Sequence, residues 1–366
     1  MRVAFLYNRS SEDPAMAAED EVPSRSPVVE ALKHLDHRVT PIACTLDLAA
    51  VRQRLMRAKP DIVFNRVESL GGSDSLMAAI TLLLDAMKIP YTGNSSAALV
   101  TTASKTYVKE RLREAGLPTP RWIEADGDRA ETGIAKFILK SVYEHASFEL
   151  DEASILSETD PEQISALLHE REAATGRAYF AEEFIDGREF NLSLIGRGPR
   201  VLPPAEIDFS AFPRGKEHIV GRSAKCDQTS FEYHNTERLF EFPASDEPLL
   251  QRISELAMEC WRLFDLCGYA RVDFRIDSGN QPWILEINTN PCTSPDAGFM
   301  AAFEHAGFNY QESVQVILET AMARPKKIQT NKNSPYFPSE NLGLAAKSTS
   351  QRLDYQPDNL SHTGSS

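Results

Sequence analysis

The chain has 366 residues, of which 42% are hydrophobic and 25% charged, and its formal net charge at pH 7 is −14. This ordinary globular composition is long enough for two or three domains. The acidic balance argues against a nucleic-acid partner or an anionic membrane surface, because no broad basic field is available.

Three further features of the sequence indicate where in the cell the protein is expected. The start, MRVAFLYN, has an apolar run of only about five residues, shorter than the ~7–15 of a signal-peptide core. No segment approaches the ~18 uninterrupted apolar residues of a membrane span. The five cysteines are odd in number and form no C-x-x-C pair. We therefore expect a soluble, reduced protein of the cytoplasm.

Residues 1–95 alternate strand and helix patterns. Strands are predicted at 2–7, 39–43, 61–65 and 89–93, and helices around 27–35, 47–58 and 75–88. Such alternation predicts a parallel sheet in a small α/β domain. No G-x-G-x-x-G follows the first strand, which sets aside a Rossmann dehydrogenase.

After Gly93 the pattern changes. One capped helix is predicted at 101–116, and from Tyr179 onward the pattern is mainly strand. The long polar segment 210–240 lacks periodicity and is typical of an active-site loop region. The remaining predicted elements are strands at 120–125, 135–140, 179–185, 188–196 and 200–209, helices at 161–174 and 247–266, the strand pair 269–288, and helices near 296–307 and 309–323.

The strand pair gathers polar residues on one face. If Gly279 and Asn280 form a two-residue loop, Asp273 faces Glu286 and Arg271 faces Asn288. Because side chains alternate along a strand, these four share one face. The other face then carries Val272, Phe274, Leu285 and Ile287.

Two carboxylates and an amide oxygen are hard ligands that suit Mg²⁺ or Mn²⁺. Asp273, Glu286 and Asn288 are therefore the predicted metal ligands, and Arg271 beside them could neutralise a phosphoryl group. The alternative is an amphipathic hairpin whose two acids simply face solvent.

Four motifs resemble those of one known family, and they follow one another along the chain in the order that the family has. Residues 268–291 are similar to the metal-binding hairpin of ATP-grasp ligases, specifically of D-alanine–D-alanine ligases. Residues 182–196 resemble the nucleotide hinge and following strand of that family. Lys105 and Lys140 stand where the family has its two ATP-binding lysines. The resemblance covers roughly residues 60–324.

The resemblance implies an α/β (α+β ATP-grasp) fold in which two subdomains clamp the nucleotide. We expect an N-terminal parallel α/β domain at 1–95, a central ATP-grasp subdomain at 96–180 and a C-terminal one, with the metal hairpin, at 181–324. Residues 325–366, which are rich in polar residues, are predicted to be a disordered tail.

The resemblance also implies an ATP site. Lys105 and Lys140 would bind phosphate oxygens as point charges. Adenine needs a donor–acceptor pair between apolar walls, and Glu189 would accept hydrogen bonds from the ribose hydroxyls. The implied ATP-binding residues are Lys105, Lys140, Ser147, Glu182, Glu183, Phe184, Ile185, Glu189 and Leu285. The alternatives are solvated lysines, a surface turn around Ser147, where Glu149 replaces the usual glycine, and an exposed strand at the hinge.

The implied reaction is ATP- and Mg²⁺-dependent joining of a carboxylate to an amine. A carboxylate is a poor electrophile, so it first takes the γ-phosphoryl group to form an acyl phosphate, which the amine then attacks. Arg271 would stabilise the oxyanion and Lys225 the γ-phosphoryl charge. Cys226 follows Lys225 where the family has an aromatic residue, and it is not expected to be a nucleophile.

The substrate half departs from the family. Its H-G-x-x-G-E-D-G loop appears as 68-ESLGGSDS-75, so Glu68 replaces the histidine. Cys292 and Ala297-Gly298 replace a glycine and a serine–leucine pair. We therefore expect amino-acid-like substrates other than two D-alanines. A genuine D-alanine–D-alanine ligase and a non-catalytic ATP-binding regulator are the alternatives, and retention of the metal ligands and lysines favours catalysis. The expected partners are the small-molecule carboxylate and amine, and homodimer formation is left open.

Overall fold

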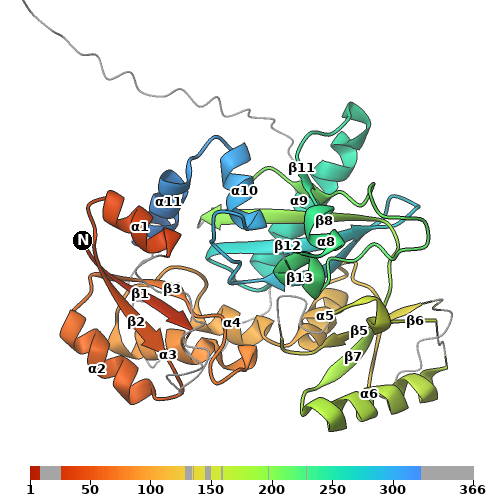
Figure 1. Ribbon diagram of the computed structural model, residues 1–366, viewed down its shortest axis with the longest axis horizontal. Helices are drawn as coiled ribbons and strands as arrows, with labels where there is room; N and C mark the ends of the chain where they lie inside the picture. Colours follow the sequence, from red (N-terminus) through yellow and green to blue (C-terminus); the bar gives the residue numbers. More distant parts are fainter. Residues whose placement is uncertain are drawn as a thin grey trace, which may run out of the picture. The chain divides into compact units, whose positions relative to one another are not determined.

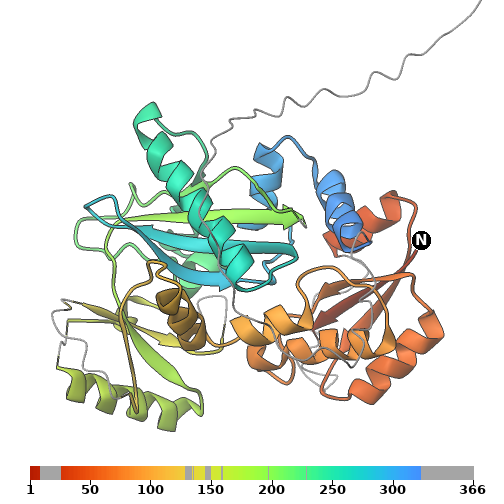
Figure 2. The ribbon, with the colours of Figure 1, turned by 180° about the vertical axis from the view of Figure 1, so that it is seen from behind.

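The computed structural model describes residues 1–8, 26–127, 134, 136–144, 150–157, 160–196, 198–227 and 229–322 (Figures 1 and 2). All of them belong to the unit Met1–Arg324. The predicted tail at 325–366 and Ser147 lie outside the described residues. No helix in the described part of the chain has the length and apolar character needed to cross a membrane.

The first sheet is parallel, as predicted, but it has three strands, and the strand predicted at 89–93 is wrong because this segment makes only an isolated bridge from Tyr91 to Val63. Strands β1 (Arg2–Asn8), β2 (Arg38–Cys44) and β3 (Ile62–Arg66) pair in the order β2-β1-β3. Alternate residues of β1 serve opposite faces: Val3 and Phe5 pack with helix α1 (Pro27–His34), and Ala4 and Leu6 with helices α2 (Leu48–Ala58) and α3 (Ala78–Met87). Burial on both faces explains why these strands are nearly continuous apolar runs.

The last two helices return to this first sheet. Helices α10 (Gly298–His305) and α11 (Tyr310–Met322) contribute Phe299, Phe303 and Ile317 to the core that contains α1, and α11 lies beside α1 (Figure 1). The segment that follows the predicted metal strand is thereby held against the N-terminal sheet.

The single helix predicted at 101–116 is two helices. Helix α4 (Ser96–Thr102) ends before Ser104, whose hydroxyl accepts a hydrogen bond (3.3 Å) from the Tyr107 N–H and caps α5 (Lys105–Glu114). A side-chain cap of this kind competes with continuation of the preceding helix. Lys105 is therefore the first residue of α5.

The second sheet is antiparallel and carries the predicted hinge. Its order is β4-β7-β5-β6, formed by β4 (Trp122–Glu124), β7 (Tyr179–Glu183), β5 (Phe137–Ser141) and β6 (Ile155–Leu156). Helix α6 (Pro161–Thr175) covers one face through Ile164 and Leu168.

The third sheet has one apolar and one polar face. Its order is β11-β10-β8-β12-β13, with β9 also on β8; the strands are β8 (Arg188–Gly196), β9 (Arg200–Val201), β10 (Ala205–Ile207), β11 (Arg238–Leu239), β12 (Gly268–Ile276) and β13 (Pro282–Asn288). Helix α9 (Glu247–Leu263) covers the face that carries Phe190, Leu192, Val272 and Phe274 (Figure 2). The opposite face carries the charged side chains.

The segment predicted as a loop region at 210–240 contains short elements. They are α7 (Arg222–Cys226), α8 (Phe231–His234) and β11. Three 3-10 turns complete the described structure: Asp74–Leu76, Glu152–Ser154 and Ala244–Asp246. Elements of four or five residues have too few turns to show a periodic pattern in sequence.

The β12–β13 hairpin has the predicted register at its functional end. Asp273 lies opposite Glu286 and Arg271 opposite Asn288. The prediction of a two-residue loop is wrong, however: the Asp277 N–H donates to the Gln281 carbonyl (3.1 Å), so the loop spans 278–280. Asn280 adopts the left-handed conformation, with φ 63°, that such loops require at their last residue.

A β-bulge compensates for the extra loop residue. Phe274 pairs with Ile284 while Asp273 pairs with Glu286, which leaves Leu285 unpaired. The prediction that Leu285 shares the apolar face is therefore wrong. Ile284 is in the core instead, and Leu285 is half-buried outside it.

Gly187, between β7 and β8, is expected to tolerate no side chain. Its φ is 152°, and a Cβ would lie 1.9 Å from the Ile276 carbonyl oxygen. Gly187→Ala should lower the free energy of unfolding in urea by about 1–3 kcal/mol. Gly198→Ala is the matched control, because its Cβ would meet nothing within 4 Å. Equal losses in the two variants would contradict this account.

Candidate active site

The predicted metal ligands lie together on the polar face of the third sheet. Asp273 is 8% exposed, and both its carboxylate oxygens accept hydrogen bonds from Arg271, from Nε and Nη2, each at 2.7 Å. Asn191, opposite Asp273 on β8, donates to Oδ1 at 3.0 Å. Glu286 is the cross-strand partner of Asp273 on the other side. Directly paired antiparallel residues have Cβ atoms about 4.5–5.5 Å apart, so their carboxylates can converge.

The donor set fits a hard divalent cation. Asn288 completes it, although its Oδ1 also accepts a hydrogen bond (3.0 Å) from the Asn290 N–H. Among the described residues, no group of three His, Cys, Asp or Glu side chains could hold a metal. Two carboxylates and an amide leave coordination positions for phosphate oxygens and water, which Mg²⁺ commonly retains.

Two cations approach these carboxylates. Burial opposes the charge of Arg271, but Asp273 and then Glu286 outweigh it and raise the pKa of the guanidinium. Lys225, on α7, is exposed at its surface. Desolvation by the surrounding protein and the charge of Arg271 lower the Lys225 pKa, while Glu286 and Asp273 oppose that change. Lys225 is therefore within electrostatic reach of the predicted metal ligands Glu286 and Asp273, and its role stays a prediction.

The two predicted phosphate-binding lysines come from the second sheet and α5. Lys105 donates a hydrogen bond from Nζ to the Glu144 carbonyl. Burial lowers the pKa of Lys105; the charge of Glu286 opposes this effect, and the charge of Lys140 adds to it. Lys140 is 18% exposed at its side chain and forms an ion pair with Glu182. Both lysines therefore belong to one cationic cluster, and Lys105 also feels the predicted metal ligand Glu286.

A third lysine in this cluster was missed from the sequence. Lys109 is 1% exposed, and its Nζ lies 2.7 Å from Glu182 Oε2. Burial lowers the Lys109 pKa to about 8 despite the nearby Glu182 charge. Burial would raise the Glu182 pKa, but Lys109 and Lys140 outweigh that effect and lower it. Lys109 follows Lys105 by one helical turn, which is the only sequence signal that could have indicated it.

The hinge acids are engaged with protein cations. Glu182 holds the two lysines, and Glu183 accepts from Arg121 Nε and Nη2, each at 2.9 Å. The N–H groups of Glu183 and Phe184 donate to the carbonyls of Arg121 and Lys136. The Ile185 N–H, by contrast, makes no hydrogen bond to another described residue. The Ile185 amide therefore differs from those of Glu183 and Phe184, which are held by backbone carbonyls.

Glu189, the residue expected to bind the ribose, lies opposite Arg275 on the polar face of the third sheet. Glu189 Oε2 lies 2.9 Å from Arg275 Nη2, and these side chains are 13% and 5% exposed. Arg275, whose Nη1 also donates to the Gly187 carbonyl (3.0 Å), was not foreseen. Phe184 is half-buried, with Arg275 Cζ 5.9 Å from its ring centroid. Leu285 is released from the core by the bulge.

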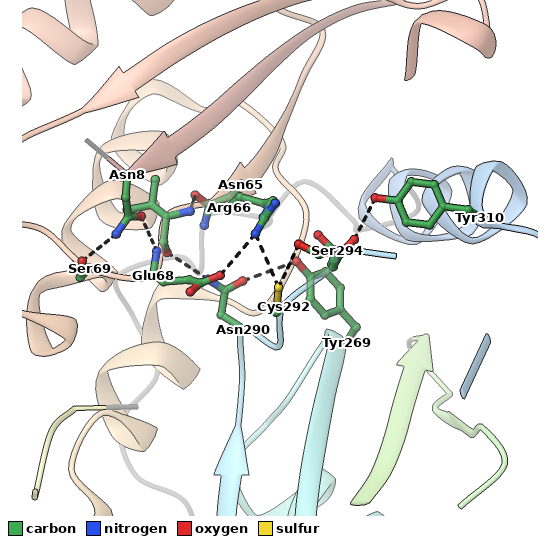
Figure 3. Close-up of polar contacts among 12 residues, drawn as sticks. Asn8, Asn65, Arg66, Glu68, Ser69, Tyr269, Asn290, Cys292, Ser294 and Tyr310 are labelled. Carbon is green, nitrogen blue, oxygen red and sulfur yellow. Dashed lines mark hydrogen bonds and ion pairs between the residues drawn. The ribbon is translucent and has the colours of Figure 1, made fainter. Parts of the chain in front are cut away.

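The residues expected to form the substrate half make a polar network between the first sheet and the segment after β13 (Figure 3). Arg66, at the carboxyl end of β3, donates to Cys292 Sγ (3.6 Å) and lies 3.9 Å from Glu68. The Glu68 N–H donates to Asn8 Oδ1 (2.7 Å), and Asn290 donates to the Val67 carbonyl (3.0 Å). Glu68 and Cys292 are two positions where the sequence departs from the family pattern. The structure brings them to one place.

The chain is similar to proteins of one known family. Residues 159–319 match the family model described as D-ala D-ala ligase C-terminus. The D-alanine–D-alanine ligase of Desulforudis audaxviator is 30% identical over 318 residues, which cover 84% of this chain and 96% of that protein. The D-alanine–D-alanine ligase of Aquifex aeolicus is 27% identical, with 87% and 100% covered. The crystal structure of D-alanine–D-alanine ligase from Bacillus anthracis complexed with ATP aligns with a TM-score of 0.64 at 18% identity, covering 88% of this chain and 97% of that one. The likeness confirms the predicted fold.

Proposed function

The chain belongs to the D-alanine–D-alanine ligase family of ATP-grasp enzymes and is an ADP-forming carbon–nitrogen ligase, and we propose that it joins two amino-acid-like substrates other than two D-alanines. The catalytic part rests on one observation: Asp273 and Glu286 face each other across β12 and β13 with Arg271 beside them. The different substrates are supported by the Arg66–Glu68–Cys292 network at the substrate half.

The proposed ATP site lies between the cationic cluster and the polar face of the third sheet. Lys105 and Lys140 would neutralise phosphate oxygens, the Ile185 N–H would donate to adenine, and Glu189 would accept from the ribose. Ser147 stays a prediction outside the described residues. Asp273, Glu286 and Asn288 would hold Mg²⁺, with Mn²⁺ as the alternative. Such a cation, when bound, neutralises phosphate charge and polarises the phosphoryl group.

The reaction would proceed in two displacements. A carboxylate oxygen of the first substrate attacks the γ-phosphorus, and the bond to the β-phosphate oxygen breaks to release ADP. The amine of the second substrate then attacks the acyl carbon, loses a proton, and displaces phosphate to leave an amide. Arg271 would hold the developing oxyanion, and Lys225 would stabilise charge on the transferred phosphoryl group.

The setting proposed for the enzyme is the cytoplasm, where ATP and small amino acids are available. D-alanine remains the second candidate for both substrates, because the relatives described above are named D-alanine–D-alanine ligases.

The test is Mg²⁺-dependent ADP release from the purified full chain, screened against pools of small carboxylates and amines that include D-alanine. We expect release only when a carboxylate and an amine are both present, with a pair other than two D-alanines turned over fastest. Fastest turnover with D-alanine alone would identify a D-alanine–D-alanine ligase. Absence of release with every pool would overturn the proposed function.

A further inference from the structure

One buried side chain from the N-terminal part of the molecule holds the point where β12 and β13 separate. Asn94, two residues before α4, is 1% exposed. Its Nδ2 donates to the main-chain carbonyls of Tyr269 (2.6 Å) and Thr289 (2.8 Å). Arg271 and Asn288 are the last paired residues at this end of the hairpin. Asn94 therefore joins the two strands directly beyond their last pair.

The backbone groups around Asn94 require an amide side chain. Both hydrogens of Nδ2 are given to carbonyls, and Oδ1 accepts a hydrogen bond from the Cys267 N–H at 2.8 Å. An aspartate would place a second acceptor against the two carbonyls, and a leucine would leave all three backbone groups without this partner. Such groups are costly to leave unpaired in a buried position. The hairpin backbone therefore accounts for asparagine at position 94.

Asn94 and the predicted metal ligand Asn288 bind opposite sides of one peptide unit. The carbonyl of Thr289 and the N–H of Asn290 belong to the same planar unit. Asn94 holds the carbonyl, and the N–H donates to Asn288 Oδ1 at 3.0 Å. Because the unit is planar, fixing the carbonyl also fixes the direction of the N–H. An amide oxygen has two lone pairs, so Asn288 Oδ1 can accept this bond and still bind a cation.

Thr102 gives the same short segment a second attachment. This residue ends α4 and is 2% exposed. Its hydroxyl donates to the Ala98 carbonyl at 2.8 Å and lies 3.0 Å from Thr289 Oγ1. Because the single hydroxyl proton of Thr102 is used on Ala98, the Thr289 hydroxyl is the donor in the second contact. Thr289, itself 1% exposed, is thus held at its carbonyl by Asn94 and at its side chain by Thr102.

We propose that Asn94 is a positioning residue of the ligase, which fixes Asn288 Oδ1 as a metal ligand and the end of β12 from which Arg271 projects. This role rests on the proposed function. Residues that hold a metal ligand in place commonly change metal affinity or activity 10- to 100-fold when they are replaced. Asn94 acts through backbone and touches no reacting atom, so its loss should weaken metal binding without removing a ligand.

The test is binding of Mn²⁺ to the purified full chain in the presence of ADP, followed through the electron paramagnetic resonance signal of free Mn²⁺. Asn94→Ala should raise the Kd for Mn²⁺ about 10- to 100-fold. Ser96→Ala is the matched control, because Ser96 lies in the same segment and its buried hydroxyl bonds instead to Asp85 of α3. The control should keep the wild-type Kd. A folded Asn94→Ala protein with the wild-type Kd would overturn the proposed role.

A milder pair of variants decides the matter if Asn94→Ala does not fold. Thr102→Val removes the second attachment while preserving the shape of the side chain, and it should raise the Kd for Mn²⁺ about 3- to 10-fold. Thr101→Val is its control, because the Thr101 hydroxyl donates only within α4, to the carbonyls of Ala97 and Ala98 (3.0 Å each). Equal Kd values for these two variants would contradict the brace formed by α4 and its preceding residues.

Turnover provides a second readout and separates this role from the proposed function. With the best substrate pair, Asn94→Ala should need about 10- to 100-fold more Mg²⁺ for half-maximal ADP release, while its KM for ATP at saturating Mg²⁺ stays that of the wild type. If no pool releases ADP, the proposed function fails, and the Mn²⁺ comparison still decides the role of Asn94. Failure of the wild type to bind Mn²⁺ with ADP would overturn the positioning role itself.

Discussion

Glu286→Gln is expected to reduce Mg²⁺-dependent ADP formation by about three orders of magnitude, since it removes a ligand charge worth several kcal/mol in the transition state. Asp273 already has Arg271 on both of its oxygens, at 2.7 Å each, so a divalent cation depends strongly on the second carboxylate. Titration of ADP release with Mg²⁺ should show both a lower maximum and a weaker apparent affinity for the metal.

Glu110→Gln, on the exposed side of α5, provides the control for loss of one negative charge. It should keep the Mg²⁺ titration of the wild type. Thermal unfolding of the Glu286→Gln protein should show that it is folded, because Glu286 is only half-buried. Normal Mg²⁺-dependent turnover in folded Glu286→Gln would show that the hairpin does not hold the metal.

Glu182→Gln is expected to have the largest effect on stability. The substitution leaves the buried Lys109 and the adjacent Lys140 without their shared counter-charge. Removing one partner of a buried ion pair costs about 3–5 kcal/mol, because the remaining charge stays desolvated. Urea denaturation at pH 7 measures this loss. Glu183→Gln is the matched control, since its partner Arg121 is 39% exposed and such pairs contribute about 0–1 kcal/mol.

Glu182→Gln is also expected to change how the free energy of unfolding depends on pH. The Lys109 pKa is about 8 in the folded protein, below its ordinary value of 10.5. Between these values the unfolded chain binds more protons at this lysine, so its contribution to the free energy of unfolding rises with pH. Without Glu182 the folded-state pKa falls further, and the rise should begin below pH 8. An unchanged onset would show that Glu182 does not hold the charge of Lys109.

Sequence reasoning succeeded where the pattern is local. Alternation along β1 and β12 predicted buried strands and one polar face, because the two-residue period of a strand depends only on the chain itself. The facing pairs of Asp273 with Glu286 and Arg271 with Asn288 were predicted in this way. The predicted register was nevertheless correct only because two differences from the prediction cancel. The loop is one residue longer than predicted, and a bulge leaves Leu285 unpaired.

Long-range burial could not be foreseen in the same way. Lys109 lies in the charged segment KERLRE and has the sequence pattern of a solvated helix residue, but packing against β7 buries it. Glu182 then neutralises the buried charge of Lys109. The break at Ser104 also depended on a competition between a side-chain cap and a continuous helix. Neither outcome is set by the composition of the segment alone.

The chain by itself specified most of the longer elements, the polar face and the family, because strand and helix periods and short motifs depend on neighbouring residues. Folding decided which distant groups meet: Lys109 of α5 reaches Glu182 of β7, and Arg66 at the end of β3 reaches Cys292, which follows β13. Such meetings depend on sheet order and on desolvation, which are properties of the packed chain. The contact between Arg66 and Cys292 is one of the features from which we infer substrates other than two D-alanines.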